Sequence, residues 1–324
     1  MGRVLVTGGG GFLGRHLVAA LVKRGDAVRT FQRSPAPPDL PPGVEHRRGD
    51  IRDAAAVANA VAGVERVIHL VSNFRSAASD GEAHGINVQG TEHVLQAALR
   101  ARVKRLVHCS TIGVHGSVLE IPAHEETPFN PGDAYQRTKL AAERRVFEVH
   151  RETGLPVSAV RPISLLGPGD RRMLKLFRMI RRRRFVLLGD GNALFQPAYV
   201  DDVVQGFLLC LDRDEAVGEA FIVGGEEFLP LRELAALVAA ELGVPAPRLR
   251  LPLAPFSALA TACEWICSPL GLEPPLHHRR LSFYRNQRAF RIEKARRLLG
   301  FEPQVSLREA LARTARWYEE HGWL

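Results

Sequence analysis

The sequence is poor in cysteine, which accounts for four of its 324 residues. The four are Cys109, Cys210, Cys263 and Cys267. They are too few and too scattered for a disulfide scaffold. To hold zinc, Cys263 and Cys267 would need two more clustered ligands, and the adjacent pair His277-His278 is a poor match in spacing. We therefore expect buried structural thiols and no metal site.

Long apolar runs are also missing. The first predicted strand begins at residue 3, which leaves no room for a signal peptide. The longest weakly charged stretch is residues 251–272, and Pro252, Pro255, Glu264 and Pro269 interrupt it. A membrane-spanning helix needs about 20 mostly apolar residues, so this stretch is not expected to span a bilayer. We expect a cytoplasmic protein.

Acidic residues are outnumbered, with 35 Asp and Glu against 44 Lys and Arg and a formal net charge of +9. Such a balance can indicate nucleic-acid binding. Many of the basic residues are dispersed, and the densest cluster is RRMLKLFRMIRRRRF at 171–185. We expect this cluster to form the exposed face of a helix, and we predict no nucleic-acid partner. An acidic partner, a phosphate-bearing substrate or an anionic membrane surface remain alternatives.

The first half of the chain alternates short β-rich runs with longer helical patterns. The predicted strands are residues 3–7, 27–31, 44–50, 65–71, 104–111 and 156–162, and the predicted helices are 12–24, 53–62, 84–101 and 133–152. Repeated βαβ units imply a parallel sheet with helices on both faces and right-handed crossovers. The sequence therefore predicts an α/β fold built on a Rossmann-type, doubly wound parallel sheet.

The regular alternation ends after Arg161-Pro162. Residues 198–211 are predicted as a helix capped by aspartates, and residues 220–225 as a strand that returns to the sheet. We therefore expect a dinucleotide-binding domain over residues 1–165, to which 198–225 also belongs. Residues 166–197 and 226–324 are expected to form a smaller, mostly helical substrate-binding region over the carboxyl edge of the sheet.

The segment TGGGGFLG lies between the first predicted strand and the first predicted helix. Its glycines fit two spacings, one through Gly9, Gly11 and Gly14 and one through Gly8, Gly11 and Gly14. A strand that enters a tight glycine turn and then a helix directs backbone N–H groups and the helix dipole at a pyrophosphate. Glycine is needed because a Cβ would block the close approach. This segment predicts a dinucleotide site.

Two further positions concern the dinucleotide. An acid after the second strand would bind the ribose hydroxyls of NAD, but the chain has none there and carries Arg33 instead. Because Arg33 can pair with a 2′-phosphate, we predict NADP ahead of NAD. Asp50, followed by Ile51, ends the third strand and is predicted to accept from the adenine amino group. Its alternative role is a helix N-cap, for which Asp53 is better placed.

Proton-transfer chemistry is indicated by DAYQRTKLAAER at 133–144. Tyr135 and Lys139 are four residues apart, so on a helix they share one face. A nearby lysine cation favours the phenolate and lets a tyrosine, whose ordinary pKa is about 10, exchange a proton near neutral pH. Ser110 and Thr111 end the fifth predicted strand, where a hydroxyl could hold the same substrate oxygen. We predict that Tyr135 and Lys139 act together with a hydroxyl from Ser110 or Thr111.

With these residues the chain resembles the extended short-chain dehydrogenases/reductases over nearly its whole length. The matching segments are TGGGGFLG at 7–14, Asp50, INVQGT at 86–91, STIGVHG at 110–116, Tyr135 with Lys139, Arg161-Pro162 and AYVDDVV at 198–204. His115 stands where many members have tyrosine, and we expect it to affect packing or the substrate edge. The combination of motifs is much more specific than any one of them.

The resemblance implies roles for individual residues. Thr111 would hold the substrate oxygen, Tyr135 would transfer its proton, and Lys139 would lower the tyrosine pKa and bind the nicotinamide ribose. A homodimer is typical of the family. The implied cofactor contacts are Gly8, Gly11, Phe12, Leu13, Gly14, Arg33, Asp50, Ile51, Leu70, Tyr135, Lys139 and Pro162.

The chain is most similar to the branch with 3β-hydroxysteroid and sterol-4-carboxylate 3-dehydrogenases, and reductases of long-chain 2-alkyl-3-oxo acids lie nearby. Dehydration is disfavoured because Ile112-Gly113 follow Thr111 where a dehydratase should have acids. We predict an NAD(P)-dependent oxidoreductase acting on a hydrophobic, steroid-like alcohol or ketone. Residues 251–272 are expected to line an apolar pocket, to touch a membrane peripherally or to pack internally. A sugar-nucleotide 4-epimerase and a non-catalytic redox-sensing regulator are the alternatives.

Overall fold

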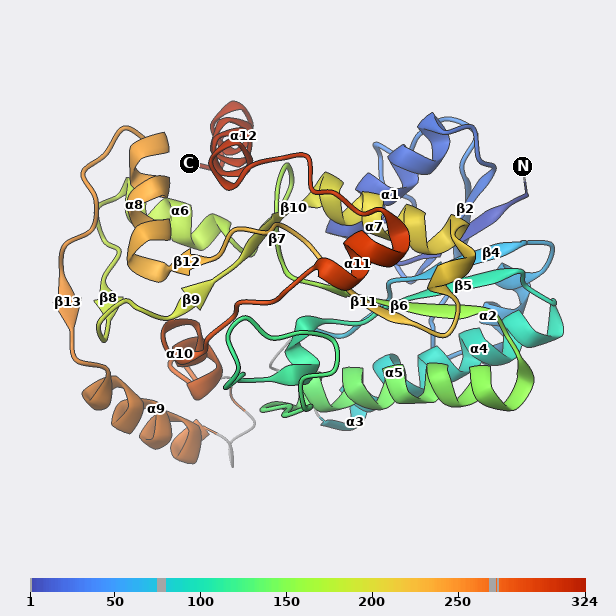
Figure 1. Ribbon diagram of the computed structural model, residues 1–324, viewed down its shortest axis with the longest axis horizontal. Coiled ribbons are helices and arrows are strands. Elements are labelled where there is room, and N and C mark those ends of the chain that lie inside the picture. Colours follow the sequence, from blue (N-terminus) through green and yellow to red (C-terminus); the bar gives the residue numbers. More distant parts are fainter. Residues whose placement is uncertain (1, 75–79, 268–271, 273) are drawn as a thin grey trace.

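The structure, a computed structural model, describes residues 2–74, 80–267, 272 and 274–324. Its main sheet has seven strands in the order β11-β6-β5-β4-β1-β2-β3 (Figure 1), and all neighbours are parallel. The strands are β1 (Val4–Thr7), β2 (Val28–Gln32), β3 (Glu45–Arg48), β4 (Arg66–His69), β5 (Arg105–Cys109), β6 (Val157–Pro162) and β11 (Ala220–Val223). The predicted Rossmann-type fold is confirmed. Strand order reverses at β1, which opens a ligand crevice at the carboxyl ends of β1 and β4.

Helices cover both faces of this sheet (Figure 1). One face carries α1 (Phe12–Lys23), α7 (Val200–Asp212) and α11 (Glu293–Leu299), and the other α2 (Ala54–Val61), α4 (Gly90–Arg100) and α5 (Ala134–Thr153). Successive strand residues point to opposite faces, so Val4 and Val6 pack with α1 while Leu5 packs with α2 and α4. Burial on both faces explains why the central strand β1 is a nearly continuous apolar run, whereas the edge strand β3 is charged and partly exposed.

The predicted helix over residues 84–101 is interrupted in the structure. It begins as α3 (Asp80–His84), passes through one π-helical turn, η1 (Gly85–Gln89), and continues as α4. The Asn87 side chain in this turn accepts from the Asn73 backbone N–H and donates to the Thr138 hydroxyl of α5 at 2.9 Å. A Cβ on Gly90 would lie 2.8 Å from the Ile51 side chain. Single π-turns are frequent at functional sites, and this one joins the strand-end loops to α5.

A second core lies beside the sheet. It is built by α6 (Leu174–Arg181), α8 (Leu231–Glu241) and α12 (Leu307–Glu320). The helix α9 (Leu253–Cys267) lies at the periphery, and α10 (His278–Arg285) lies between it and the rest of the structure (Figure 1). Outside the main sheet, the described residues also form three short strand pairs and two 3₁₀ turns. They are β7 (Ser164–Leu166) with β10 (Pro197–Tyr199), β8 (Leu187–Leu188) with β13 (Arg250–Leu251), β9 (Leu194–Phe195) with β12 (Leu229–Pro230), η2 (Ile112–His115) and η3 (Asp214–Ala216).

The basic cluster at 171–185 contains the amphipathic helix α6. Its apolar side chains, among them Phe177 and Ile180, are buried in the second core. Its arginines face outward, and two of them bond to α12 and the segment after it: Arg178 donates to the Trp323 carbonyl, and Arg181 to Glu319 at 2.8 Å. The expected exposed basic face is therefore confirmed, with part of its charge already used inside the molecule.

Two local predictions are wrong. The cysteines were expected to be buried, but this holds for Cys210 alone, and Cys109, Cys263 and Cys267 are only partly buried. The aspartates at the start of α7 do not cap the helix, because the N-cap is Tyr199 and makes no side-chain cap bond. Asp201 and Asp202 lie inside the first turn, where their charges favour the helix dipole. Asp202 is buried and accepts from the Gln304 backbone N–H at 2.7 Å, so it ties the C-terminal segment to α7.

Among the residues that the structure describes, no helix has both the length and the apolar character needed to cross a bilayer. The strand β11 lies beside β6 at one edge of the main sheet. The division of the chain into two domains remains a prediction.

Candidate active site

The glycine turn between β1 and α1 has geometric demands at three positions. Gly8 has φ of +75°, and its N–H donates to the Phe31 carbonyl of β2 at 2.8 Å. Gly11 donates to the Gly8 carbonyl and is the N-cap of α1. A Cβ on Gly14 would lie 2.3 Å from the Gly8 carbonyl oxygen, so α1 can pack on the turn only if this residue is glycine. The geometry therefore favours the spacing through Gly8, Gly11 and Gly14.

This turn fits a pyrophosphate. Gly11 has no side chain with which to cap α1, which leaves the N–H groups of the first turn, including those of Phe12 and Leu13, directed at the crevice. A side chain on the turn would fill the space that the phosphates need. Leu70, at the end of β4, closes the crevice from the other side and donates its N–H to the Thr7 carbonyl at 3.1 Å.

The ends of β2 and β3 surround the expected adenosine position. Gln32 accepts from the Gly10 N–H through its side-chain oxygen, which holds the glycine turn to β2. Arg33 is exposed, and its carbonyl accepts from the Arg48 guanidinium at 3.1 Å, so two cations lie together at this edge. Asp50 bonds to Arg52 at 2.7 Å, and this hydrogen bond lowers the pKa of the Asp50 carboxyl to about 2.

The alternative role for Asp50 can be assessed from the same loop. Asp53, not Asp50, is the N-cap of α2, and its carboxylate accepts from two backbone N–H groups. Ile51 is buried against Gly90, with its carbonyl bonded to the His93 ring at 3.0 Å. Asp50 is thus an ionised carboxylate at the strand end that no helix cap uses, and its contact with adenine remains a prediction.

Thr111 and Tyr135 line one cavity of about 410 Å³. Thr111 follows β5, and its hydroxyl oxygen accepts from the Gly113 N–H at 3.0 Å as the N-cap of η2. Because that bond uses a lone pair, the hydroxyl hydrogen can still be donated. Tyr135 is the second residue of α5, and its ring meets the Phe74 ring edge-on at 5.2 Å. Leu13 and Pro162 line the same cavity.

Lys139 is one turn further along α5 and is almost fully buried. Its ammonium donates to the Cys109 carbonyl at 2.6 Å and lies 3.4 Å from the His108 ring. Burial lowers the pKa of Lys139. Burial also lowers the pKa of His108, and the Lys139 charge adds to that effect, so His108 is neutral and its ring nitrogen can accept from the lysine. The sequence analysis missed this acceptor.

The rest of the cavity is mainly apolar. Four phenylalanines from distant parts of the chain meet there, namely Phe74, Phe195, Phe283 and Phe290. The other apolar side chains are Leu13, Ile112, Pro162, Ile163, Leu165 and Met173. The uncharged polar members, besides Thr111 and Tyr135, are Ser110, Gln136, Ser164, Ser282 and Asn286, and the charged members are Asp133, Arg172 and Arg288. The sequence analysis above assigned no role to residues 285–303, RNQRAFRIEKARRLLGFEP. The aromatic and basic residues of this segment were the signal that could have found Arg288 and Phe290.

The expectation that residues 251–272 line the pocket is wrong for the described part of this stretch. The cavity wall on that side comes from α10 and the segment after it, while α9 lines none of it. Ala260 is the one buried residue of α9, and Leu253 and Phe256 pack beside it against α10 and β8. The physical reason is that α10 lies between α9 and the strand ends.

Comparison with known proteins decides the family. The sequence profile described as "NAD dependent epimerase/dehydratase family" matches residues 4–224, more than half of the chain. The chain belongs to that family. It is therefore an enzyme of the NAD-dependent short-chain dehydrogenase/reductase type, as the sequence motifs indicated.

Several relatives align over nearly the full length of this dehydrogenase/reductase. A 2-alkyl-3-oxoalkanoate reductase from Stenotrophomonas maltophilia is 34% identical, with 96% of this chain and 98% of the relative covered. A 3-beta-hydroxysteroid dehydrogenase from Mycolicibacterium neoaurum is 32% identical, with 99% and 92% covered. Among solved structures, dTDP-glucose 4,6-dehydratase from Streptomyces venezuelae, with NAD bound, is 29% identical with a TM-score of 0.80, and 99% and 98% of the chains are covered.

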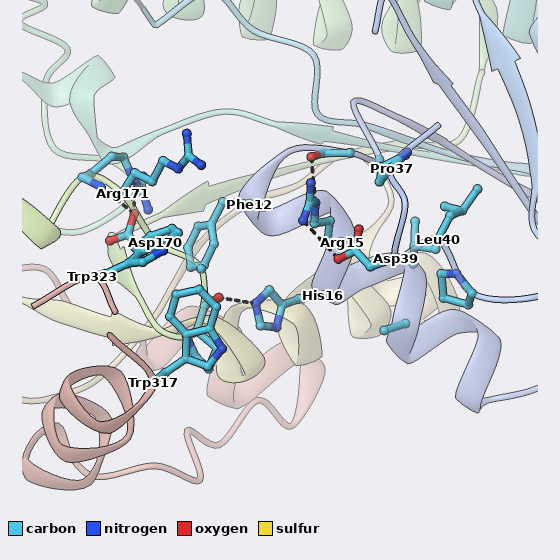
Figure 2. A pocket seen from close by; sticks show the side chains of 18 residues that line it. Phe12, Arg15, His16, Pro37, Asp39, Leu40, Asp170, Arg171, Trp317 and Trp323 are labelled. Carbon is cyan, nitrogen blue, oxygen red and sulfur yellow. Dashed lines mark hydrogen bonds and ion pairs between the residues drawn. The ribbon is translucent and has the colours of Figure 1, made fainter. Parts of the chain in front are cut away.

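A larger hollow of about 680 Å³ lies on the outer face of α1 in this dehydrogenase/reductase (Figure 2). Phe12, Arg15 and His16 of α1 point into it, with Trp317 and Trp323 at one end and the 37–41 loop at the other. None of Thr111, Tyr135 and Lys139 lines it. Its charges are largely paired within the protein: Arg15 bonds to Asp39 at 3.0 Å, and Arg172 to Asp170 at 3.0 Å. The cavity at Tyr135 is therefore the better candidate for substrate.

His115 packs beneath the cavity and is fully buried. Its ring bonds to the Thr127 carbonyl at 2.8 Å and to the Arg161 guanidinium at 3.1 Å. Burial lowers its pKa to about 4, so it is neutral and can accept from Arg161. Arg161 in turn pairs with Glu143 of α5, and both side chains are buried. Of the two expected effects of His115, the geometry favours packing.

Proposed function

We propose that the protein interconverts a secondary alcohol and a ketone on a hydrophobic, steroid-like substrate, with NAD(P) as the hydride carrier. The observation that carries this proposal is the position of Thr111 and Tyr135 on one apolar cavity, with Lys139 one helical turn away. The cavity lies at the carboxyl edge of the sheet, on the side to which the glycine turn would bring a nicotinamide. Hydride transfer to or from a carbon needs this combination of a proton relay and a dry pocket.

The glycine turn would hold the pyrophosphate, and Lys139 with Tyr135 would hold the nicotinamide ribose. When bound, the cofactor supplies the hydride acceptor or donor. In the oxidative direction, Tyr135 takes the hydroxyl proton as the hydride leaves the substrate carbon. Thr111 donates a hydrogen bond to the same oxygen and orients it. The Lys139 ammonium stabilises the Tyr135 phenolate because it lies on the same helix face.

The apolar lining supports a hydrophobic substrate. Four phenylalanines and five aliphatic side chains line the cavity around the proton relay, the latter being Leu13, Ile112, Ile163, Leu165 and Met173. Polar side chains also line it, among them Gln136, Ser164 and Asn286, so the sugar-nucleotide 4-epimerase stays the alternative. The relatives named above as a steroid dehydrogenase and a 2-alkyl-3-oxoalkanoate reductase support the same substrate class. Between these two, a steroid-like ring system and a branched long-chain oxo acid both suit the lining.

The test is a substrate screen followed by nicotinamide absorbance, with NAD(H) and NADP(H) supplied separately. Sterols, long-chain 3-oxo and 3-hydroxy acids and UDP-sugars form the panel. Turnover of a hydrophobic member that depends on added cofactor supports the proposal. A 4-epimerase would instead purify with NAD bound and convert UDP-sugars without added cofactor. Cofactor binding with no turnover of any member would favour the redox-sensing regulator.

NADP is proposed as the preferred cofactor. Arg33 and Arg48 are both exposed at the end of β2 and β3, and no acidic side chain occupies the position after β2. Replacing Arg33 by glutamine is expected to reduce kcat/KM for NADP about 10-fold or more and to leave kcat/KM for NAD nearly unchanged. The measurement is the ratio of the two kcat/KM values in wild type and variant. Equal losses for both cofactors would contradict the proposed role of Arg33.

Peripheral contact with an anionic membrane is proposed for α9, which lies at the edge of the molecule (Figure 1). Trp265 is 80% exposed and Ile266 58% exposed. Exposed cations at Arg248 and Arg250 precede the helix, which suits a negatively charged lipid surface. Co-sedimentation with anionic vesicles should exceed that with neutral vesicles, and should fall in a Trp265→Ser, Ile266→Ser double variant with unchanged turnover. Binding that survives the double variant would contradict this role.

A homodimer is also proposed, on the family resemblance alone. Light scattering of the purified protein would give the mass directly, and a monomer at working concentrations would contradict it.

A further inference from the structure

The cavity at Tyr135 contains an arginine whose charge is not neutralised. Arg288 lines the cavity, and among the described residues no carboxylate forms an ion pair with it. Its guanidinium makes two long contacts, both 3.4 Å, to the carbonyl and hydroxyl of Ser282. Burial alone lowers its pKa, whereas a neighbouring acid would raise it. A partly buried guanidinium with spare donors calls for an anion.

The other charged groups of the cavity do not meet that need. Arg172 also lines it, but bonds to the buried Asp170 at 3.0 Å and so carries its own counter-ion. Asp133 is the one carboxylate among the described lining residues. It accepts from the Gln136 N–H at 2.8 Å as the N-cap of α5, where the helix dipole favours its charge. Arg288 therefore keeps the uncompensated positive charge.

The backbone around Arg288 is held on both sides. Its own N–H donates to the Leu194 carbonyl at 3.1 Å. The Ala289 carbonyl accepts from the Ala123 N–H at 2.8 Å. The Phe290 N–H donates to the Gln196 side chain at 2.7 Å, and the same side chain donates back to the Phe290 carbonyl. The backbone that carries Arg288 is therefore fixed before a ligand binds, which reduces the backbone entropy lost on binding.

The surroundings of the guanidinium strengthen any charge-assisted bond it makes. Its central carbon lies 5.9 Å from the centre of the Phe195 ring, and Phe283 and Phe290 line the same cavity. Apolar walls exclude water and raise the strength of an ionic hydrogen bond. The planar guanidinium matches a carboxylate with two parallel N–H···O bonds. A neutral alcohol would leave these donors without a partner.

We propose that Arg288 anchors a carboxylate carried by the substrate, so that the enzyme acts on an apolar hydroxy acid or the matching oxo acid. This inference rests on the proposed function, because it places the reacting oxygen at Thr111 and Tyr135 in the same cavity. The carboxylate binds at Arg288, the hydrocarbon part packs on the phenylalanines, and the alcohol lies at Tyr135. The anionic group orients the substrate in a pocket that otherwise holds it only by shape.

A matched pair of compounds tests this assignment. The probes are a 2-alkyl-3-hydroxy acid with two medium-length chains and its methyl ester, each oxidised with added NAD(P). Wild type is expected to prefer the acid by about 100-fold in kcat/KM. Arg288→Gln should lose about 100-fold on the acid and almost nothing on the ester, and Arg288→Lys should recover part of the loss. Arg285→Gln, at the exposed end of α10, is the control and should behave as wild type.

Direct binding of the acid, measured by calorimetry in protein saturated with the oxidised cofactor, separates the two proposals. Binding that depends on Arg288 without any oxidation supports the carboxylate site and overturns the proposed alcohol chemistry. Oxidation of the acid and the ester with equal kcat/KM, unchanged in Arg288→Gln, overturns the carboxylate site alone. A third outcome also overturns the carboxylate site. In that outcome the acid is neither bound nor oxidised, while the neutral ester or a neutral sterol is turned over.

Discussion

Replacing Tyr135 by phenylalanine is expected to lower kcat by about 1,000-fold or more while cofactor affinity changes by no more than a few-fold. The substitution removes one hydroxyl and keeps the ring, so the edge-on contact with Phe74 can persist. Losing a positioned acid–base group typically costs 10²- to 10⁴-fold, and no other described cavity residue offers a hydroxyl at that point of α5. The measurements are nicotinamide absorbance for turnover and fluorescence titration for NAD(P)H binding.

Tyr284→Phe is the matched control for this variant. Tyr284 lies on α10, packs against Phe283 at 5.3 Å between ring centres, and does not line the cavity. It therefore tests the loss of a tyrosine hydroxyl elsewhere in the same part of the fold, and its kcat should stay within about 2-fold of wild type. Turnover of the Tyr135 variant at more than a tenth of the wild-type rate would sink its role as the proton carrier.

The parts of the site that the sequence predicts are those set by short-range geometry. The strand-turn-helix at TGGGGFLG and the four-residue spacing of Tyr135 and Lys139 depend only on nearby residues and on the period of a helix. The strand end that carries Thr111 follows from the apolar run of β5. In all three cases the local pattern decides the local backbone, and the parallel sheet then brings the strand ends to one edge.

The substrate cavity could not be predicted in the same way. Phe74, Phe195 and Phe283 come from three separate segments, and their meeting depends on how the second core docks on the sheet. Composition also left the placement of residues 251–272 open. An apolar helix can pack inside, line a pocket or lie exposed, and α9 leaves Leu259 and Trp265 in solvent. Only the position of α10 distinguishes these outcomes.

Replacing Lys139 by methionine is expected to lower kcat/KM about 100-fold or more while stability at pH 7 stays the same or rises by about 1–2 kcal/mol. The activity falls because the Tyr135 phenolate loses its cation. The pH at which the variant reaches half of its maximal activity should accordingly rise, toward the ordinary tyrosine pKa of about 10. Stability does not fall because methionine has a similar shape and removes a buried charge that, among the described residues, makes its hydrogen bonds to the neutral Cys109 carbonyl and His108 ring.

The sign of the stability change follows from the lowered pKa of Lys139. At pH 7 the unfolded chain binds the lysine proton more readily than the folded chain, so the folded state bears a cost that the variant avoids. That cost disappears as pH rises through the folded pKa toward 10.5, the ordinary pKa of lysine, and the stability difference between variant and wild type should shrink over the same range. Urea unfolding of variant and wild type at pH 7 and at higher pH measures this difference in the free energy of unfolding.

Lys104→Met gives the matched comparison, because Lys104 is 72% exposed and pairs with Glu65 on the surface. Its loss should change neither the pH profile nor the stability by more than about 0.5 kcal/mol. A Lys139 variant that loses activity and stability together, with no movement of its pH profile, would show that the lysine acts only as a support for β5. Loss of activity with retained stability fits either proposed role of Lys139, and the alkaline shift distinguishes its action on the Tyr135 proton from its hold on the nicotinamide ribose.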